Sequence, residues 1–218
     1  MQVAGILADL AVKADFFIKY YRYRGYEGCT PDDIRERQRR RLERLLRHAL
    51  ARSAFYRALY GEAGITLADV PDVSLADLPI IDKGVVMDHY DDLVCDPALR
   101  KADLLAFLAD PAKADARYRH RYTVIHTSGS SGRIGLFVYD DRHLNWLNIL
   151  FLKYLYGVRR LVRDMLPQRV AFWGVTGGHY AGYTLTSRCT HYGLPYLPLA
   201  VETPLDEAAA RLNAFQPT

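Results

Sequence analysis

The sequence is poor in cysteine and has no long apolar run. Its three cysteines, Cys29, Cys95 and Cys189, lie far apart and form no C-x-x-C pair, which favours a reducing, cytoplasmic compartment over a disulfide framework. No segment approaches the roughly 20 apolar residues of a membrane-spanning helix. The apolar start, residues 3–12, is interrupted by Asp9 and follows no basic region, so it does not resemble a signal peptide.

Metal-binding patterns are also missing. The seven histidines form neither H-x-x-x-H nor H-E-x-x-H, and we therefore expect no metal site made by them. The net charge of +4 suits a protein that binds anionic metabolites without requiring a nucleic acid partner. With 218 residues, half of them apolar, the chain is long enough for a substantial core.

The most informative segment is residues 122–140, which reads YTVIHTSGSSGRIGLFVYD. The runs at 123–125 and 136–139 favour strands, and the glycines and serines between them supply a turn, so the segment predicts a β-loop-β unit. Glycine lets backbone N–H groups approach an anion, and the loop adds hydroxyls and one guanidinium. It therefore predicts a polyphosphate site. The expected contacts come from Thr127, Ser128, Gly129, Ser130, Ser131, Gly132 and Arg133.

Better-known loops do not fit this segment. A Walker loop would need glycine where Ile134 stands, and a Rossmann loop would need glycine where Ser131 stands. The G-x-S-x-G nucleophile elbow is not matched either. The spacing of Ser128, His126 and Asp140 does not support a hydrolase triad.

Residues 127–132, TSGSSG, resemble the phosphate-binding loop of the adenylate-forming acyl- and aryl-CoA synthetases. Upstream, residues 45–49, 53–57 and 74–83 resemble the phenylacetate–CoA ligase-like branch, which includes proteins of capsular polysaccharide biosynthesis. The resemblance covers, with gaps, most of the chain after residue 40. It departs from the family at Ile134, where proline is common.

The resemblance implies an α/β fold in which a helical N-terminal region, residues 1–65, precedes a partial nucleotide-binding domain, residues 66–218. That domain would be the first part of the mostly parallel, helix-flanked sheet of the adenylate-forming fold. The family's adenine-binding and acidic motifs, hinge and lysine-bearing C-terminal domain are not among these 218 residues. We therefore expect this portion to be inactive alone, and we expect apolar sheet surface left exposed by the missing strands to favour a homodimer or aggregation.

The implied activity is that of an ATP-dependent carboxylate–CoA ligase, which activates an aryl or acyl acid as an acyl-adenylate. ATP, Mg²⁺, coenzyme A and a small carboxylate are the implied ligands. The alternative is a non-catalytic remnant or interaction module that keeps this half of the fold.

A second glycine-rich segment, residues 174–182, follows an expected strand at 169–173. Ligands of α/β proteins often bind at such loops. The resemblance places the region near the acyl or aryl pocket, with Gly177, Gly178, His179 and Tyr180 as candidate substrate-binding residues. A steric bend with a merely hydrogen-bonded His179 is the open alternative.

Two N-terminal patterns allow a structural and a functional interpretation. An aromatic cluster at residues 16–23 favours an arm packed on the domain over a membrane-surface or partner helix. The arginine-rich segment 35–47 carries a leucine stripe and i,i+4 Glu–Arg pairs, which favour a solvated helix face over an anionic-polymer site.

Further elements follow from caps and periodicity. Helices are expected at 99–110, 140–157 and 205–215, and a second short strand at 196–199. The charged stretch 111–121 is expected to be an exposed connection.

Overall fold

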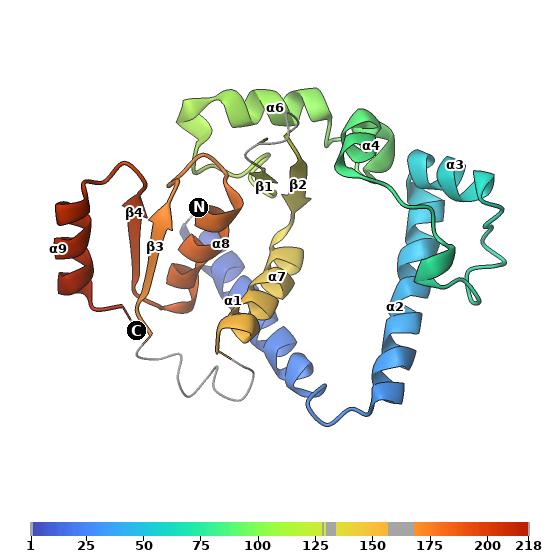
Figure 1. Cartoon of the computed structure of the whole chain (residues 1–218), viewed down its shortest axis with the longest axis horizontal. Coiled ribbons are helices and arrows are strands. Elements are labelled where there is room, and N and C mark those ends of the chain that lie inside the picture. The colour runs from blue at the N-terminus through green and yellow to red at the C-terminus, as the bar shows by residue number, and fades with distance from the viewer. Residues whose placement is uncertain (1, 128, 130–133, 157–167, 218) are drawn as a thin grey trace. The chain divides into compact units, whose positions relative to one another are not determined.

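The computed structural model describes residues 2–127, 129, 134–156 and 168–217 (Figure 1). It is a mixed α/β structure in which helices predominate over two small sheets, which confirms the expected class. No helix among the described residues is long and apolar enough to cross a membrane.

The chain divides into two compact units. The first contains residues 1–24 and 107–218, and the second contains residues 25–106. The boundary expected after residue 65 falls within the second unit. The expected N-terminal region is itself divided between the units at Gly25.

The second unit is helical. Its α-helices are α2 (Pro31–Arg52), α3 (Ala54–Glu62), α4 (Lys83–Asp88), α5 (Tyr90–Leu93) and most of α6 (Lys101–Ala109), with a 3-10 turn η1 (Leu75–Asp77). Thr30 and Asp33 form a capping box that satisfies free backbone donors at the start of α2. The core of α2 and α3 includes Leu46, Leu50 and Tyr60.

Several arginines on the basic face of α2 form ion pairs with glutamates of the same helix. Glu36 lies within ion-pair distance of Arg39 and Arg40, and Glu43 pairs with Arg47. Hydrogen bonds from Arg39 and Arg40 lower the pKa of Glu36 to about 2. The geometry agrees with a solvated helix face carrying local charge pairs.

The first unit contains both sheets. Strands β1 (Thr123–His126) and β2 (Leu136–Tyr139) form an antiparallel hairpin, in which Thr123 is opposite Tyr139. Strands β3 (Val170–Gly174) and β4 (Tyr196–Ala200) pair in parallel. The described residues therefore do not form the expected mostly parallel sheet. They form two separate two-stranded sheets, one antiparallel and one parallel.

Helices surround these strands: α1 (Gln2–Arg24), α7 (Asp141–Tyr156), α8 (Ala181–Ser187) and α9 (Leu205–Phe215), with 3-10 turns η2 (Pro111–Lys113) and η3 (Arg188–Tyr192). Asp140 begins α7 by accepting a hydrogen bond from the backbone N–H of His143 at 2.9 Å. Helix α1 packs along α7. The Phe16 ring stacks on Tyr192 at 4.1 Å between centroids.

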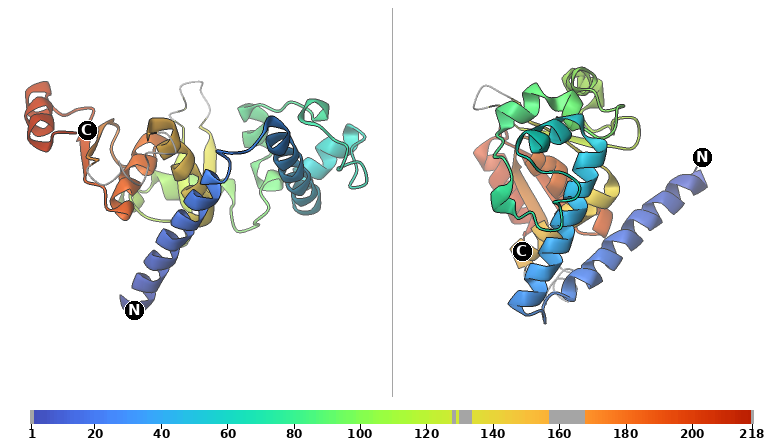
Figure 2. Two further views of the ribbon diagram at one scale, coloured as in Figure 1. Left: turned by 90° about the horizontal axis from the view of Figure 1, so that it is seen from below. Right: turned by 90° about the vertical axis from the view of Figure 1, so that its right-hand side faces the viewer.

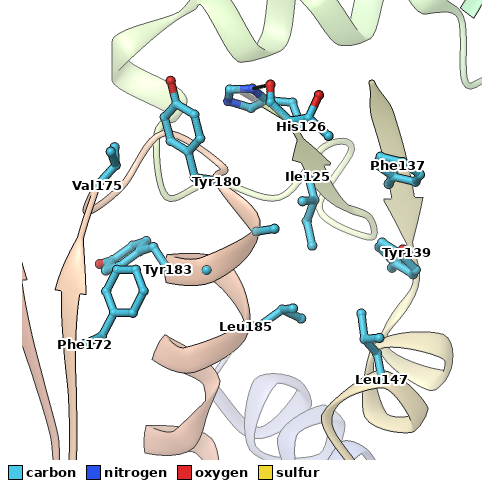
Figure 3. A pocket seen from close by; sticks show the side chains of 13 residues that line it. Ile125, His126, Phe137, Tyr139, Leu147, Phe172, Val175, Tyr180, Tyr183 and Leu185 are labelled. Carbon is cyan, nitrogen blue, oxygen red and sulfur yellow. Dashed lines mark hydrogen bonds between the residues drawn. The ribbon is translucent and has the colours of Figure 1, made fainter. Parts of the chain in front are cut away.

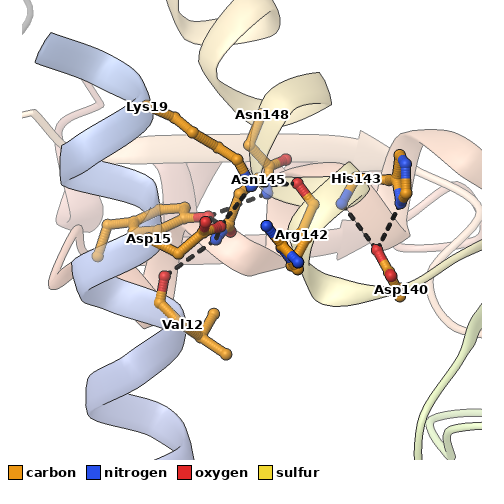
Figure 4. A network of polar contacts seen from close by, with 9 residues as sticks. Val12, Asp15, Lys19, Asp140, Arg142, His143, Asn145 and Asn148 are labelled. Carbon is orange, nitrogen blue, oxygen red and sulfur yellow. Dashed lines mark hydrogen bonds and ion pairs between the residues drawn. The ribbon is translucent and has the colours of Figure 1, made fainter. Parts of the chain in front are cut away.

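A buried polar network joins α1 to α7 (Figure 4). Asn145 is fully buried; its amide donates to the carbonyl oxygen of Val12 at 2.9 Å and to Asp15 at 2.8 Å. Lys19 donates to Asp15 at 2.5 Å and to the carbonyl oxygen of Arg142 at 2.6 Å. The aromatic arm is thus fixed to the body of its unit, as the favoured interpretation predicted.

The stretch 111–121 is exposed at most of its positions, as expected for a connection, and it ends in a bridge between two tyrosines. Tyr118 and Tyr122 are buried and exchange two backbone hydrogen bonds of 2.9 Å. Arg119 and His120 between them have φ values of 50° and 56°. Residues other than glycine rarely adopt positive φ values, so arginine and histidine at these two positions gave no reason to predict a turn from the sequence.

Candidate functional site

Thr127 closes the base of the predicted phosphate loop. Its backbone N–H donates to the carbonyl oxygen of Gly135 at 3.1 Å, and its Oγ1 accepts from the N–H of Gly135 at 2.9 Å. Gly129 has a φ of 70°, which favours glycine. Ser128 and residues 130–133, which carry most of the expected contacts, lie outside the described residues.

The second glycine-rich segment makes a tight bend after β3. Gly177, Gly178 and His179 have consecutive φ values of 85°, 66° and 65°. Such a run is accessible to glycine but is strained for histidine. The bend brings Tyr180 beside β1, where the N–H of His126 donates to the carbonyl oxygen of His179 at 3.2 Å.

His126 connects the two loops through its side chain. Its Nε2 lies 2.8 Å from the carbonyl oxygen of Gly178, and its Nδ1 lies 3.0 Å from that of Thr127. The imidazole also contacts the Tyr180 ring, with centroids 4.4 Å apart. A neutral imidazole has one N–H and can donate to only one of these two carbonyls at a time.

His179 points away from this contact. Its Nε2 lies 2.8 Å from the carbonyl oxygen of Lys113, and its ring lies 5.0 Å from that of Phe107. The side chain is buried. These contacts agree with the alternative in which His179 is a hydrogen-bonded residue of the bend.

A pocket of about 490 Å³ opens between the hairpin, β3 and α8 (Figure 3). Its lining residues are Ile125, His126, Thr127, Phe137, Tyr139, Leu147, Phe172, Val175, Tyr180, Ala181, Gly182, Tyr183 and Leu185. This described lining is mostly apolar and carries no acidic or basic side chain other than His126. In Figure 3, His126 and Tyr180 lie at one end, whereas Leu147 and Leu185 lie towards the other.

Two glycines make room for one wall of this pocket. A Cβ at Gly182 would lie 3.1 Å from the Phe172 ring, and one at Gly174 would lie 2.8 Å from it. Both distances are shorter than normal carbon–carbon contacts. The Phe172 ring can therefore lie against α8 and β3 only because these positions have no side chain.

The chemistry available in this pocket is that of binding and orientation. Aromatic walls accept a flat apolar group, and the hydroxyls of Thr127 and Tyr180 provide polar atoms among the lining residues, whereas both ring nitrogens of His126 already face backbone carbonyls. Among the described residues, no three His, Cys, Asp or Glu side chains gather as a metal ion would require.

The structure brings together only some of the predicted site residues. Thr127 and Tyr180 both line the pocket; the described lining does not include Gly177, Gly178 or His179. Sequence reasoning missed the place of His126 in the pocket and the aromatic wall. A signal was present, because Phe137 and Tyr139 are two apart on a strand and therefore face one side.

Comparisons with known proteins do not assign a family to the chain. The chain matches no protein-family model, and it matches no curated protein sequence. Membership of the adenylate-forming family accordingly remains an expectation from the sequence motifs.

Proposed function

We propose that this chain is the ATP-binding portion of an adenylate-forming carboxylate–CoA ligase, and that its substrate is an aromatic or similarly apolar carboxylic acid. The observation that carries the proposal is that Thr127, the first residue of the predicted phosphate loop, also lines an aromatic pocket. One residue thus belongs to both candidate sites, as an enzyme that joins a carboxylate to ATP would need.

The hairpin supports the phosphate part of the proposal. The two bonds between Thr127 and Gly135 join the described residues on either side of the predicted phosphate loop. Backbone amides in a glycine-rich loop of this kind of sequence are suited to an anion. The serine hydroxyls and Arg133 would add donors, each worth roughly 1.5–3 kcal/mol towards a charged group.

The pocket supports the acid part. Its volume of about 490 Å³ falls within the usual range for small-molecule sites. The apolar walls would hold the ring of the acid, and a carboxylate would be better solvated at the end that carries the hydroxyls of Thr127 and Tyr180. This orientation directs the carboxylate towards the predicted phosphate loop.

In the proposed reaction, a carboxylate oxygen attacks the α-phosphorus of ATP and pyrophosphate leaves with the electrons of the broken P–O bond. A thiol then attacks the acyl carbon of the adenylate, loses its proton and displaces AMP. Donors in the loop would stabilise the charge that grows on pyrophosphate. Among the described residues, no group of three His, Cys, Asp or Glu side chains could hold Mg²⁺ without the phosphates of ATP.

Calorimetric titration of the chain with ATP and with phenylacetate tests both parts. We expect both ligands to bind, and expect Ser128→Ala with Ser131→Ala to weaken ATP binding by about tenfold or more. In the complete enzyme the same pair should suppress pyrophosphate release.

Ser187→Ala with Thr190→Ala is the matched control, because those hydroxyls donate to nearby backbone carbonyls in the α8–η3 segment. Equal ATP binding by the loop variant and the parent chain would reject the phosphate site. Failure of both ligands to bind would favour the interaction-module alternative.

A further inference from the structure

Helix α1 presents two different faces within the first unit. One face packs against the rest of the unit. Phe16 and Tyr20 are buried in a core with Ile149, and Lys19 is buried beside Asp15. Helix α1 is therefore held to the body of the unit through this face.

The opposite face is apolar and exposed. Leu10, Phe17, Ile18 and Tyr21 keep 55%, 42%, 54% and 59% of their surface accessible. At about 100° per residue, these four positions fall on one stripe of the helix. Large apolar side chains that gather in this way, rather than singly, mark an interaction surface.

The charges that accompany this stripe are basic. Arg22 and Arg24 lie exposed in the last turn, and Lys13 lies at the rim beside Leu10 and Phe17 by helical spacing. The acidic Asp15 is drawn to the inner side by Lys19 and Asn145. Figure 2 shows the N-terminal part of α1 extending away from the sheets of its own unit.

We propose that α1 is an interfacial helix that lies on an anionic lipid bilayer. The stripe of Leu10, Phe17, Ile18 and Tyr21 enters the headgroup boundary, while Arg22, Arg24 and Lys13 contact anionic headgroups. Aromatic and aliphatic residues bordered by basic residues are typical of helices that lie in the membrane surface without crossing it. This inference stands independently of the proposed ligase activity.

The charge pattern argues against a second copy of the chain as the occupant. A twofold contact through the stripe would pair the two helices antiparallel, and the described side chains of the stripe would then offer no carboxylate to Arg22 and Arg24 of either copy. An anionic surface instead complements them.

The test is co-sedimentation of the whole chain with vesicles of phosphatidylcholine, with and without phosphatidylglycerol. We expect binding to the anionic vesicles that weakens with added salt. Ile18→Ser should lower the partition coefficient by about tenfold, because a buried isoleucine side chain contributes on that order. Ile80→Ser is the matched control, since Ile80 is fully exposed in the second unit.

The charge contribution is tested with Arg22→Gln and Arg24→Gln together, which should reduce anionic-vesicle binding by about tenfold or more. Arg44→Gln with Arg52→Gln, on α2, is the control. An equal loss in both pairs, no vesicle binding at all, or a dimer that Ile18→Ser dissociates without any vesicle binding would overturn the proposal. Circular dichroism of each variant establishes that the fold is retained.

Discussion

The Nε2 atom of His126 lies 2.8 Å from the carbonyl oxygen of Gly178, so one side chain joins the end of β1 to the glycine-rich bend. Thr127, the next residue, begins the predicted phosphate loop. The position of the bend, and with it Tyr180, therefore depends on the same residue that precedes the loop. His126 is a positioning residue in the proposed enzyme.

His126→Phe should weaken binding of aromatic acids while leaving the pocket aromatic. The substitution keeps a ring against Tyr180 but removes both ring nitrogens, so the carbonyl of Gly178 or Thr127 that accepts from the imidazole loses its donor, at a cost of about 1–3 kcal/mol in unfolding free energy. Calorimetric titration with phenylacetate and urea unfolding measure the two effects. His48→Phe, at an exposed position of α2, should change neither. Unaltered acid binding in the His126 variant would exclude the positioning role.

Gly182→Ala should reduce the room in the pocket. The methyl group would be added at a residue that lines the pocket, and it would lie 3.1 Å from the Phe172 ring, so the ring must shift to admit it. We expect the affinity for phenylacetate to fall while acetate is little affected, because only the larger acid needs that space. Titration of both acids checks this.

Gly61→Ala is the control for the alanine substitution itself. Gly61 lies in α3, and a methyl group added there would have no neighbouring atom within 4 Å. The change should therefore raise the unfolding free energy by about 0.5–1 kcal/mol through helix propensity. It should not alter acid binding. If Gly182→Ala also leaves acid binding intact, the acid does not occupy this pocket.

Local pairing of serine or threonine with aspartate should make the second unit sensitive to acid. The carboxylates of Asp33, Asp69 and Asp77 each accept a side-chain and a backbone hydrogen bond from the residue three positions earlier. These bonds lower the three pKa values from 3.8. Stability from these carboxylates is thus complete above the unfolded pKa and is lost as pH falls through the folded pKa.

Urea unfolding between about pH 5 and pH 2 should show this loss. Asp77→Asn should lower stability at neutral pH and reduce the acid-dependent part, since the amide does not titrate. Asp206→Asn, at an exposed position of α9, serves as the comparison. An acid-dependent loss of the same size in the Asp77 variant would show that this carboxylate does not contribute.

Local patterns predicted most of the elements. The β-branched run at 123–125 predicted β1, the acids at 140 and 141 predicted the start of α7, and the 205–215 periodicity predicted α9. Each of these signals lies within a few residues of the element that it specifies. The hairpin around the predicted phosphate loop could be predicted from the sequence for the same reason.

The pocket could not be predicted from local sequence patterns, because its walls come from distant parts of the chain. Nothing near Phe172 indicates that its ring will line a cavity together with Tyr139 and Leu147, or that Gly182 will make room for it. Likewise, the orientation of His179 towards the Lys113 carbonyl depends on a segment more than 60 residues earlier. Such placements follow from tertiary packing, which one sequence does not reveal.

Asn145→Ala should be one of the more destabilising single substitutions in the first unit. Asn145 is fully buried, and it donates to the Val12 carbonyl and to Asp15 while accepting a 3.0 Å bond from the Tyr192 hydroxyl. Alanine would leave these buried partners unpaired, at a cost of about 3 kcal/mol or more, given roughly 1–3 kcal/mol for each group.

Asn148→Ala is the matched variant, because Asn148 is also buried on the same helix but makes a weaker set of contacts. Its amide donates to Tyr192 at 3.1 Å, and its Oδ1 has no partner among the described residues. Removing an already unpaired buried oxygen offsets part of the loss, so this variant should cost less by about 1–2 kcal/mol. Urea unfolding of both variants measures the difference. Because the Asn145 bonds hold α1 to α7, its variant should also speed amide exchange in α1, whereas equal stability and equal exchange in the two variants would show that the network does not fix the helix.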